Sequence, residues 1–395
     1  MRMSRLWYVV LAAWVLVPVF AYAAPVKSTV EVSGWLPYWK AASSTQDTLP
    51  NLGNLTTVHP FSFTVGTNGF ILDTLDITSE PWQSFMQEAK KQKVRVIPTI
   101  MWADGEAIHR ILSDDESREQ LVDDIVELVE EHGFDGIDID FESKWAETNG
   151  HFSAFLRELY REMGKSWVYC TIESRTPLSS RYDTVPANIE YANDYREINK
   201  YCDRVQIMAY DQGTIDLKLS RAAAGPYVPI SDVRWVEKVM REAAKTIKKN
   251  KLVIGIPTYG YEYQVAPLSA STFFYERMWA FNLRYALDTA SKLGLTPTRN
   301  TAGELQLMYL PQMLEHGKPV NDATSSNLGI LTTALSNVAT APVVRTTFNM
   351  MTWGDSTSVS QKIALAKKLG IRGIAIFKFD GGQDPKIWDV LAGKK

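Results

Sequence analysis

A run of nine residues, FDGIDIDFE at 134–142, constrains the fold of this chain more than any other segment. Read with a period of two, one face of the run is apolar and consists of Ile137, Ile139 and Phe141. The opposite face carries three carboxylates, Asp138, Asp140 and Glu142. The apolar face suits a strand packed against helices, but burying like charges costs several kcal/mol each unless they share protons or accept hydrogen bonds. The run therefore predicts a strand that serves chemistry as well as stability.

An exposed edge strand with an acidic solvent face is the alternative interpretation of the same run. The flanking Gly133 and Gly136 and the Ile/Phe face favour an interior strand instead. Asp135 lies at the start of the run, off the carboxylate face, and suits a structural role at the bottom of the strand as well as a functional one.

Strand and helix patterns alternate along the whole chain. Eight strand candidates begin near residues 30, 55, 94, 134, 167, 204, 251 and 371, mostly with helical patterns between them. The clearest helix, at 114–132, is acidic in its first turn and is stopped by Gly133. Such alternation with buried strands predicts the α/β class and a parallel (β/α)8 TIM barrel.

The segment 260–351 is too long for a simple connection in a compact barrel. It contains a helix-like stretch at 273–293, strand-like stretches at 304–309 and 347–353, and a Ser/Thr/Asn-rich middle at 324–347. We expect a small α+β insertion at 260–351 after the seventh strand. The catalytic barrel then comprises residues 28–259 and 352–393.

The N-terminus has the pattern of a signal peptide over residues 1–23. A basic start is followed by an apolar run from Leu6 to Phe20 and by an A-x-A cleavage signal at 21–23. The alternative is an uncleaved anchor, and both imply export. We expect a secreted, periplasmic or cell-envelope protein with no further membrane segment. Outside a reducing cytosol Cys170 and Cys202 could pair, and the sequence leaves that open.

The composition disfavours several classes of function. The formal net charge is −3 and no run of five or more Lys or Arg residues occurs, so nucleic-acid binding is not expected. The chain has two cysteines, and its five histidines are scattered without ligand spacing. No metal and no other cofactor is therefore implied.

The carboxylate strand suits acid-catalysed cleavage of an acetal. In a barrel of this type the active site is built at the C-terminal ends of the strands, so Glu142 would lie at the mouth with Asp140 and Asp138 below it. A carboxyl group near other carboxylates in a dry site has a raised pKa, which makes it a usable general acid near neutral pH. The deeper aspartates can share a proton.

The motifs resemble those of glycoside hydrolase family 18, the chitinase-like hydrolases. DGIDIDFE at 135–142 matches the D-x-x-D-x-D-x-E signature of the family. QIMAYD at 206–211 and GIPTYG at 255–260 resemble its sixth-strand and seventh-strand motifs. Many members also carry an α+β subdomain after the seventh strand.

The resemblance implies a retaining mechanism assisted by the substrate. The resemblance implies that Glu142 protonates the glycosidic oxygen and later activates water, while the substrate's 2-acetamido oxygen attacks C1. The resemblance implies that Asp140 orients the acetamido group and that Asp138 tunes the proton of Asp140. Tyr210 would position the acetamido oxygen, and Asp211 would contact the sugar. From the residues alone, a core tyrosine and a loop-starting Asx residue remain the alternatives for these last two.

Further substrate contacts are expected from the motifs and from aromatic residues at strand ends, since sugar rings stack on aromatic faces. Each aromatic residue alone is more often part of a core than of a binding site. The family usually places a Trp on its eighth strand beneath the sugar, and this chain has a Phe there. The candidates are Trp35, Trp39, Trp102, Gln206, Met208, Tyr259 and Phe377.

The leading hypothesis is an exported hydrolase of β-1,4-linked N-acetylglucosamine (GlcNAc) polysaccharides or oligosaccharides. Chitin with its oligosaccharides and the glycan strands of peptidoglycan are the competing substrates. The ordering of elements around the insertion resembles that of members acting on bacterial cell wall, but the choice stays open. The alternative is a non-catalytic, lectin-like barrel that binds carbohydrate, an interpretation that Phe377 keeps open.

Overall fold

The structure is a computed structural model and describes residues 30–316, 324–340 and 346–393. The expected signal peptide, residues 1–23, lies outside the described residues. Within the described segments no helix is both long enough and apolar enough to cross a membrane.

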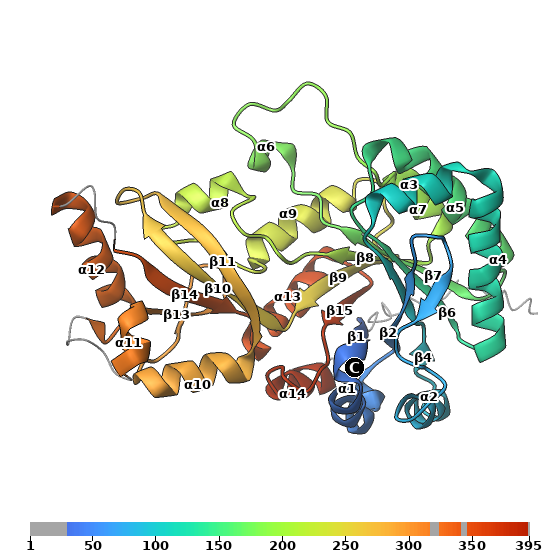
Figure 1. Cartoon of the computed structure of the whole chain (residues 1–395), viewed down its shortest axis with the longest axis horizontal. Helices are drawn as coiled ribbons and strands as arrows, with labels where there is room; N and C mark the ends of the chain where they lie inside the picture. Colours follow the sequence, from blue (N-terminus) through green and yellow to red (C-terminus); the bar gives the residue numbers. More distant parts are fainter. Residues whose placement is uncertain (1–29, 317–323, 341–345, 394–395) are drawn as a thin grey trace, which may run out of the picture.

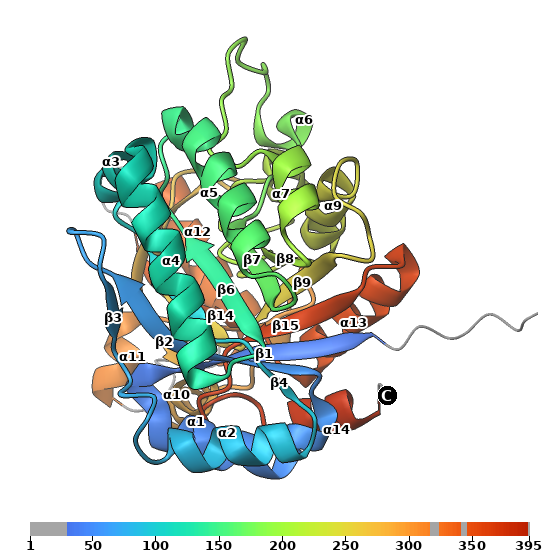
Figure 2. The same ribbon diagram turned by 90° about the vertical axis from the view of Figure 1, so that its right-hand side faces the viewer.

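Eight parallel strand positions close into a barrel (Figure 1 and Figure 2). β1 pairs in parallel with both β15 and β2, which closes the ring, and β4 and β5 together occupy the third position. The predicted TIM barrel is confirmed, because strands begin within two residues of all eight predicted starts. The barrel strands are β1 (Glu31–Pro37), β2 (Thr57–Val65), β4 (Arg95–Val96), β5 (Thr99–Trp102), β6 (Gly136–Phe141), β7 (Trp167–Glu173), β8 (Arg204–Met208), β9 (Leu252–Pro257) and β15 (Gly373–Phe377).

Helices cover the outside of the barrel, and aspartate caps start several of them. The Asp114 carboxylate accepts from the Ser117 N–H at 2.9 Å, and Gly133 ends the same helix with φ 61° in the left-handed region. The helices are α1 (Ala41–Thr48), α2 (Trp82–Lys91), α3 (Gly105–Ser113), α4 (Asp115–His132), α5 (Asn149–Glu162), α6 (Leu178–Arg181), α7 (Tyr195–Tyr201), α8 (Leu217–Ala222), α9 (Val233–Ala243), α13 (Ser356–Leu369) and α14 (Lys386–Ala392). The short strand β3 (Ile71–Asp73) forms a hairpin with β2.

The carboxylate strand β6 is an interior strand, paired with β5 on one side and β7 on the other. Ile137, Ile139 and Phe141 are fully buried in the hydrophobic layer between the barrel and its helices. Because side chains alternate along a strand, Asp138 and Asp140 point into the barrel. The edge-strand alternative is therefore excluded.

A second, five-stranded antiparallel sheet follows β9 in the chain and lies beside the barrel, at the left in Figure 1. It has its own core, which includes Val265, Leu307, Phe348 and Met351. Its elements are β10 (Tyr259–Pro267), β11 (Phe273–Asn282), α10 (Leu283–Leu293), β12 (Thr298–Arg299), β13 (Leu305–Tyr309), α11 (Pro311–His316), α12 (Asn327–Thr340) and β14 (Phe348–Trp353).

The expected helix at 273–293 is wrong in its first half. Residues Phe273–Asn282 form β11, and only Leu283–Leu293 are helical. The run FFYERMWAFN is rich in residues that favour strands, and it pairs antiparallel with the whole of β10. Nonlocal pairing therefore decides the structure of a segment whose local pattern is ambiguous.

A buried carboxylate fixes the second sheet to the loop after β8. Glu304, directly before β13, accepts hydrogen bonds from the backbone N–H groups of Ile230 and Ser231 at 3.0 and 2.5 Å. The Thr352 hydroxyl of β14 donates to the same carboxylate at 2.8 Å. The segment 209–232, which contains Tyr210 and Asp211 near its start, is thus held against the second sheet.

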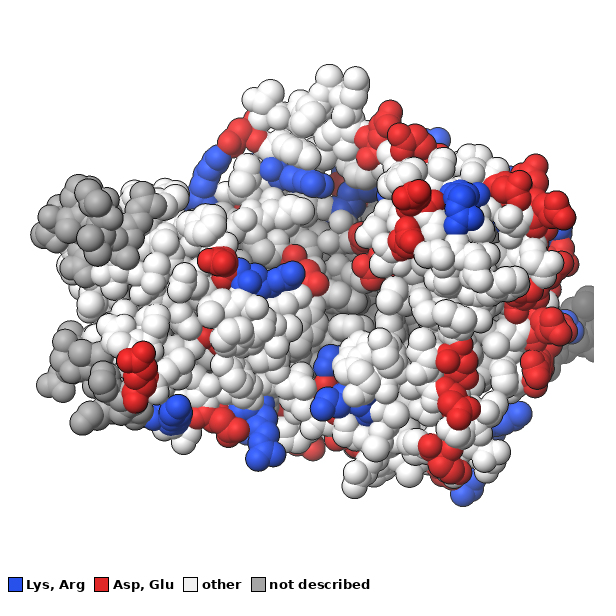
Figure 3. All heavy atoms as spheres, in the orientation of Figure 1, with Lys and Arg blue, Asp and Glu red and all other residues white. Residues whose placement is uncertain are grey.

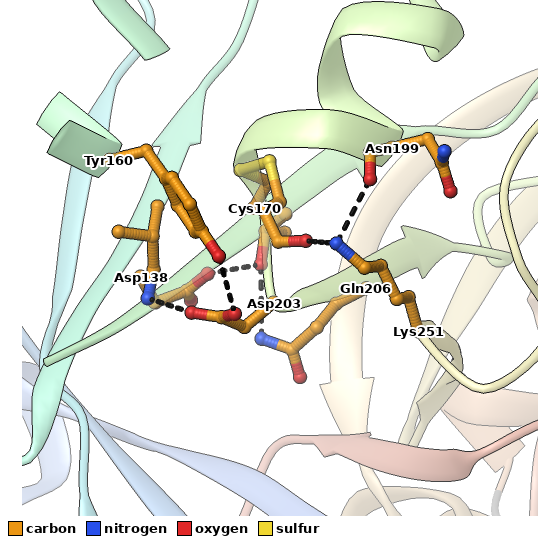
Figure 4. The surroundings of a disulfide bond; sticks show 10 residues. Asp138, Tyr160, Cys170, Asn199, Asp203, Gln206 and Lys251 are labelled. Carbon is orange, nitrogen blue, oxygen red and sulfur yellow. Dashed lines mark hydrogen bonds between the residues drawn. A yellow bond between two sulfur atoms is a disulfide. The ribbon is translucent and has the colours of Figure 1, made fainter. Parts of the chain in front are cut away.

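Cys170 of β7 and Cys202, which directly follows α7, form a disulfide with a Cα–Cα distance of 6.0 Å (Figure 4). The pairing that the sequence left open is therefore present. Polar contacts surround it: the Asp203 carboxylate accepts from the Val168 N–H at 3.0 Å, and Lys251 donates to the Cys202 carbonyl at 2.7 Å. The bridge ties the strand after the carboxylate strand to the start of β8.

Candidate active site

A pocket of about 510 Å³ opens at the C-terminal ends of the barrel strands and is bordered by β10 and β11. Figure 3 shows this face hollowed between the barrel and the second sheet. In the described part of the chain, no three His, Cys, Asp or Glu side chains gather as they would around a metal ion. The lining includes the expected residues Trp39, Asp140, Glu142, Met208, Tyr210, Asp211, Tyr259 and Phe377.

Asp138 is the deepest carboxylate, and its side chain is completely buried inside the barrel. Its Oδ1 accepts a hydrogen bond from the Thr171 hydroxyl at 2.8 Å. Its Oδ2 accepts from the Thr99 hydroxyl at 2.8 Å and from the Trp35 indole N–H at 3.1 Å. The adjacent strands β5 and β7 and the more distant β1 therefore supply donors that compensate the burial of this group.

Asp140 lies one step nearer the mouth and has the opposite environment. It is 4% exposed, and its buried Oδ1 has no hydrogen-bond partner among the described residues. Burial raises the pKa of Asp140 well above its usual range, and the carboxylates of Glu142 and Asp138 raise it further. Asp140 is therefore suited to hold a proton that it can share or donate.

Glu142 follows β6 and lines the pocket, half-buried. Burial raises the pKa of Glu142, the carboxylate of Glu173 raises it further, and Lys144 opposes the effect. The buried Lys144 ammonium lies 3.9 Å from Oε2 of Glu173, and the Asn193 amide donates to the same oxygen at 2.8 Å. A carboxyl group with a raised pKa that faces a pocket can act as a general acid.

Tyr210 and Asp211 follow β8 and form another part of the pocket wall. Burial raises the pKa of Tyr210 well above its usual range, with further contributions from Asp140 and Glu142, so its hydroxyl keeps its proton. Gly255 makes room for this ring, because a Cβ there would lie 3.0 Å from Cε1 of Tyr210 and 2.6 Å from the Ile207 carbonyl oxygen. Asp211 has a left-handed backbone with φ 56° and accepts a hydrogen bond from the Tyr259 hydroxyl at 2.5 Å.

Phe377 ends β15 and forms the apolar floor of the pocket. Its ring stacks on Tyr210 with centroids 5.6 Å apart and an interplanar angle of 19°. It also meets Tyr259 edge-on at 6.1 Å and Trp35 at 5.8 Å. Trp39, 46% exposed, stands at the rim.

Three of the expected substrate contacts, Trp35, Trp102 and Gln206, are buried and do not line the pocket. Trp102 is 2% exposed and its ring packs edge-on against Phe141 at 5.3 Å, in the layer between barrel and helices, because it alternates to the outer face of β5. Gln206 is fully buried, and its amide donates to the Thr171 hydroxyl at 3.2 Å. Trp35, 1% exposed, lies beneath the pocket, where it donates a hydrogen bond to Asp138 and packs against Phe377.

Sequence reasoning missed several residues at the site. Glu173 and Lys144 shape the charge around Glu142, and the position of Glu173 as the last residue of the strand after β6 was a readable signal. The other members of the pocket come from β2, β10 and β11 and from the segments that follow β1 and β15, and packing between elements far apart in the sequence brings them together. These are Lys40, Phe61, Tyr261, Ala280, Phe281, Asn282, Lys378 and Asp380.

Several known proteins are similar to this chain in sequence. The Bacillus subtilis protein named uncharacterized glycosylase YvbX is 27% identical over 227 residues, which are 55% of this chain and 63% of that protein. The cortical fragment-lytic enzyme of the same organism is 24% identical over 352 residues, covering 86% of this chain and 67% of that enzyme. The chain thus matches less than two thirds of YvbX.

A solved structure shares the fold. The Bacillus cereus spore cortex-lytic enzyme SleL superposes with a TM-score of 0.68 at 20% identity, over 93% of this chain and 75% of that one. The family model of glycosyl hydrolases family 18 matches residues 34–382. That span runs from β1 through the carboxylate strand to the loop after β15, and the chain therefore belongs to glycosyl hydrolase family 18.

Proposed function

We propose that this protein is an exported glycosidase that hydrolyses β-1,4-linked GlcNAc glycans with retention of configuration and with assistance from the substrate. The observation that carries the proposal is the carboxylate ladder of β6. Asp138 lies buried among three donors, Asp140 has a raised pKa, and Glu142 faces the pocket.

The proposed first step uses Glu142 as the general acid. It transfers its proton to the glycosidic oxygen while the bond from that oxygen to C1 breaks and the substrate's own acetamido oxygen attacks C1. Asp140 lies directly below and accepts the acetamido N–H, which acquires positive character in the oxazolinium intermediate. The Tyr210 hydroxyl, which stays protonated, donates to the acetamido oxygen and aligns it.

The second step uses Glu142 as the general base. The carboxylate takes a proton from water, the water oxygen bonds to C1, and the bond from C1 to the acetamido oxygen breaks. Two displacements at C1 give net retention. Phe377 supplies the apolar surface beneath the sugar ring, and Asp211 is placed to accept a hydrogen bond from a sugar hydroxyl.

Bacterial cell-wall glycan is our leading substrate, ahead of chitin. Two of the relatives are named for lysis of cortical fragments and of spore cortex. Export is supported by the Cys170–Cys202 disulfide, since such bonds persist in oxidising compartments, and by the signal-peptide pattern of residues 1–23.

The test compares wild type with Glu142→Gln on N-acetylchitooligosaccharides and on purified peptidoglycan. The variant keeps the size of the side chain but has no acidic proton, so turnover should fall by about 10²- to 10⁴-fold while glycan binding persists. Glu130→Gln, an exposed change on α4, is the matched control and should behave as wild type. Full activity in Glu142→Gln would refute the assignment of the acid.

The second candidate is a lectin-like barrel that binds glycan without cleaving it. Phe377 favours it, because this ring offers less stacking area than the Trp expected at that position. Measurable binding of both glycans with no turnover by wild type would support this alternative and refute the hydrolase.

A further inference from the structure

A second pocket of about 750 Å³ continues from the active-site pocket, and Asp211 and Tyr261 line both. It lies between the segment 213–228 after β8 and the β10–β11 hairpin. Aromatic rings make up much of its wall, including Tyr263, Phe273 and Tyr275. A glycan that binds at Asp211 can therefore extend along an aromatic surface on which sugar rings can stack.

The two walls of this pocket are held together by hydrogen bonds. The Tyr227 N–H, from the loop after β8, donates to the hydroxyl oxygen of Tyr275 on β11 at 2.7 Å. The Tyr227 hydroxyl in turn donates to Asp232 at 2.7 Å, and the Gln212 amide donates to the Tyr227 oxygen at 3.0 Å. The pocket is thus formed before a ligand arrives, which lowers the entropy lost on binding.

Two arginines line the pocket, and they differ in their partners. Arg221 donates to both carboxylate oxygens of Asp183 at 2.5 and 2.6 Å, so its charge is matched. Arg277 on β11 lies with its guanidinium 4.9 Å above the ring of Tyr261. Within the described ranges, Arg277 has no carboxylate within ion-pair distance.

We propose that this second pocket is a subsite for an acidic unit of the glycan and that Arg277 binds the carboxylate of that unit. The proposal rests on the proposed function, because it names the substrate class of the same groove. The ring of Tyr261 supports the guanidinium from one face and leaves its N–H edge free to meet a planar carboxylate. The acid group belongs at the Arg277 end, because Asp211 is itself a carboxylate and would repel it.

Peptidoglycan offers such a carboxylate from two sources, the lactyl ether of its muramic unit and its stem peptides, whereas chitin is neutral. The shared chemistry is the carboxylate, and defined substrates separate the sources. The test therefore uses peptidoglycan glycan strands without peptide, strands with peptide, peptide-free strands whose carboxylates have been amidated, and N-acetylchitooligosaccharides.

The measured quantity is the ratio of kcat/KM on each acidic glycan to kcat/KM on the neutral oligosaccharide. Arg277→Gln should lower this ratio about tenfold, the loss expected for one hydrogen bond to a charged group, and Arg277→Lys should restore part of it. Arg284→Gln is the matched control, since Arg284 is exposed on α10 and pairs with Asp288. Amidation of the glycan should lower kcat/KM of the wild type to the value that Arg277→Gln has on the unmodified glycan. It should not lower kcat/KM of Arg277→Gln any further.

An effect on peptide-free strands identifies the lactyl carboxylate, and an effect confined to peptide-bearing strands identifies the peptide. An unchanged ratio in Arg277→Gln would overturn the proposal. Calorimetry tests the subsite without turnover. It compares binding of the same glycans to Glu142→Gln and to the double variant Glu142→Gln/Arg277→Gln. A chain that cleaves nothing but still prefers acidic glycan through Arg277 would refute the hydrolase and leave the subsite standing.

Discussion

Reducing the Cys170–Cys202 disulfide should lower the free energy of unfolding without changing the active site. The two cysteines are 32 residues apart, and closing a loop of that length removes chain entropy from the unfolded state. The chain-entropy relation gives about 3.7 kcal/mol at 25 °C for a loop of about 32 residues. This is a large part of the roughly 5–15 kcal/mol that keeps a typical domain folded.

Urea unfolding of oxidised and reduced wild-type protein, followed by intrinsic tryptophan fluorescence, measures the effect. The comparison keeps both sulfur atoms in the core, and a Cys170→Ala/Cys202→Ala double variant should not respond to reductant. Turnover of the folded, reduced protein should stay within about twofold of the oxidised rate, because Cys170 packs in the outer layer while its neighbour Thr171 faces Asp138. A difference of less than about 1 kcal/mol between oxidised and reduced protein would refute the loop-closure argument.

Two further predictions concern the charge around Glu142 and the position of Trp102. Burial and the Glu173 carboxylate raise the pKa of Glu142 and Lys144 lowers it, so Glu173→Gln should move the alkaline limb of the kcat/KM profile to lower pH. Lys144→Met should move that limb to higher pH. Alkaline limbs of both variants that lie at the same pH as that of the wild type would contradict the electrostatic assignment. Trp102→Phe should lower stability by about 1–3 kcal/mol and leave KM unchanged, because Trp102 packs on Phe141. A KM raised severalfold with unchanged stability would restore Trp102 as a substrate contact.

The parts of the fold that could be predicted are those encoded by short-range periodicity. The FDGIDIDFE run alternates apolar and acidic residues from Ile137 to Glu142, and β6 spans Gly136–Phe141 within it. The end of α4 was equally clear, since Gly133 takes a left-handed backbone that other residues rarely adopt. Carboxylates on one face of a strand at the mouth of a barrel then had to meet the pocket, and Asp140 and Glu142 do.

The parts that could not be predicted depend on partners far away in the sequence. Whether Trp102 faces the pocket or the helix layer is decided by the register of β5 against β6, which the local sequence does not contain. The helical pattern expected at 273–293 ignored the pairing of β11 with β10. Lys144 carries no pattern at all, and only the fold brings its ammonium to 3.9 Å from Glu173 of the next strand and into the electrostatic environment of Glu142.

The environments of the three carboxyl groups differ from the bottom of the carboxylate ladder to its top. At the bottom, both oxygens of Asp138 accept hydrogen bonds from three donors, so negative charge is compensated there. Burial raises the pKa of Asp140, and the charges of Glu142 and Asp138 raise it further, while one oxygen of Asp140 has no partner among the described residues. At the top, burial and Glu173 raise the pKa of Glu142 and Lys144 lowers it. The same two side chains act in the same directions on Asp140, so this pair can set the proton affinity of both upper groups. If the ladder works in this way, replacing Glu173 changes the pH at which the reaction runs, whereas replacing Asp138 removes the charge on which the middle position depends.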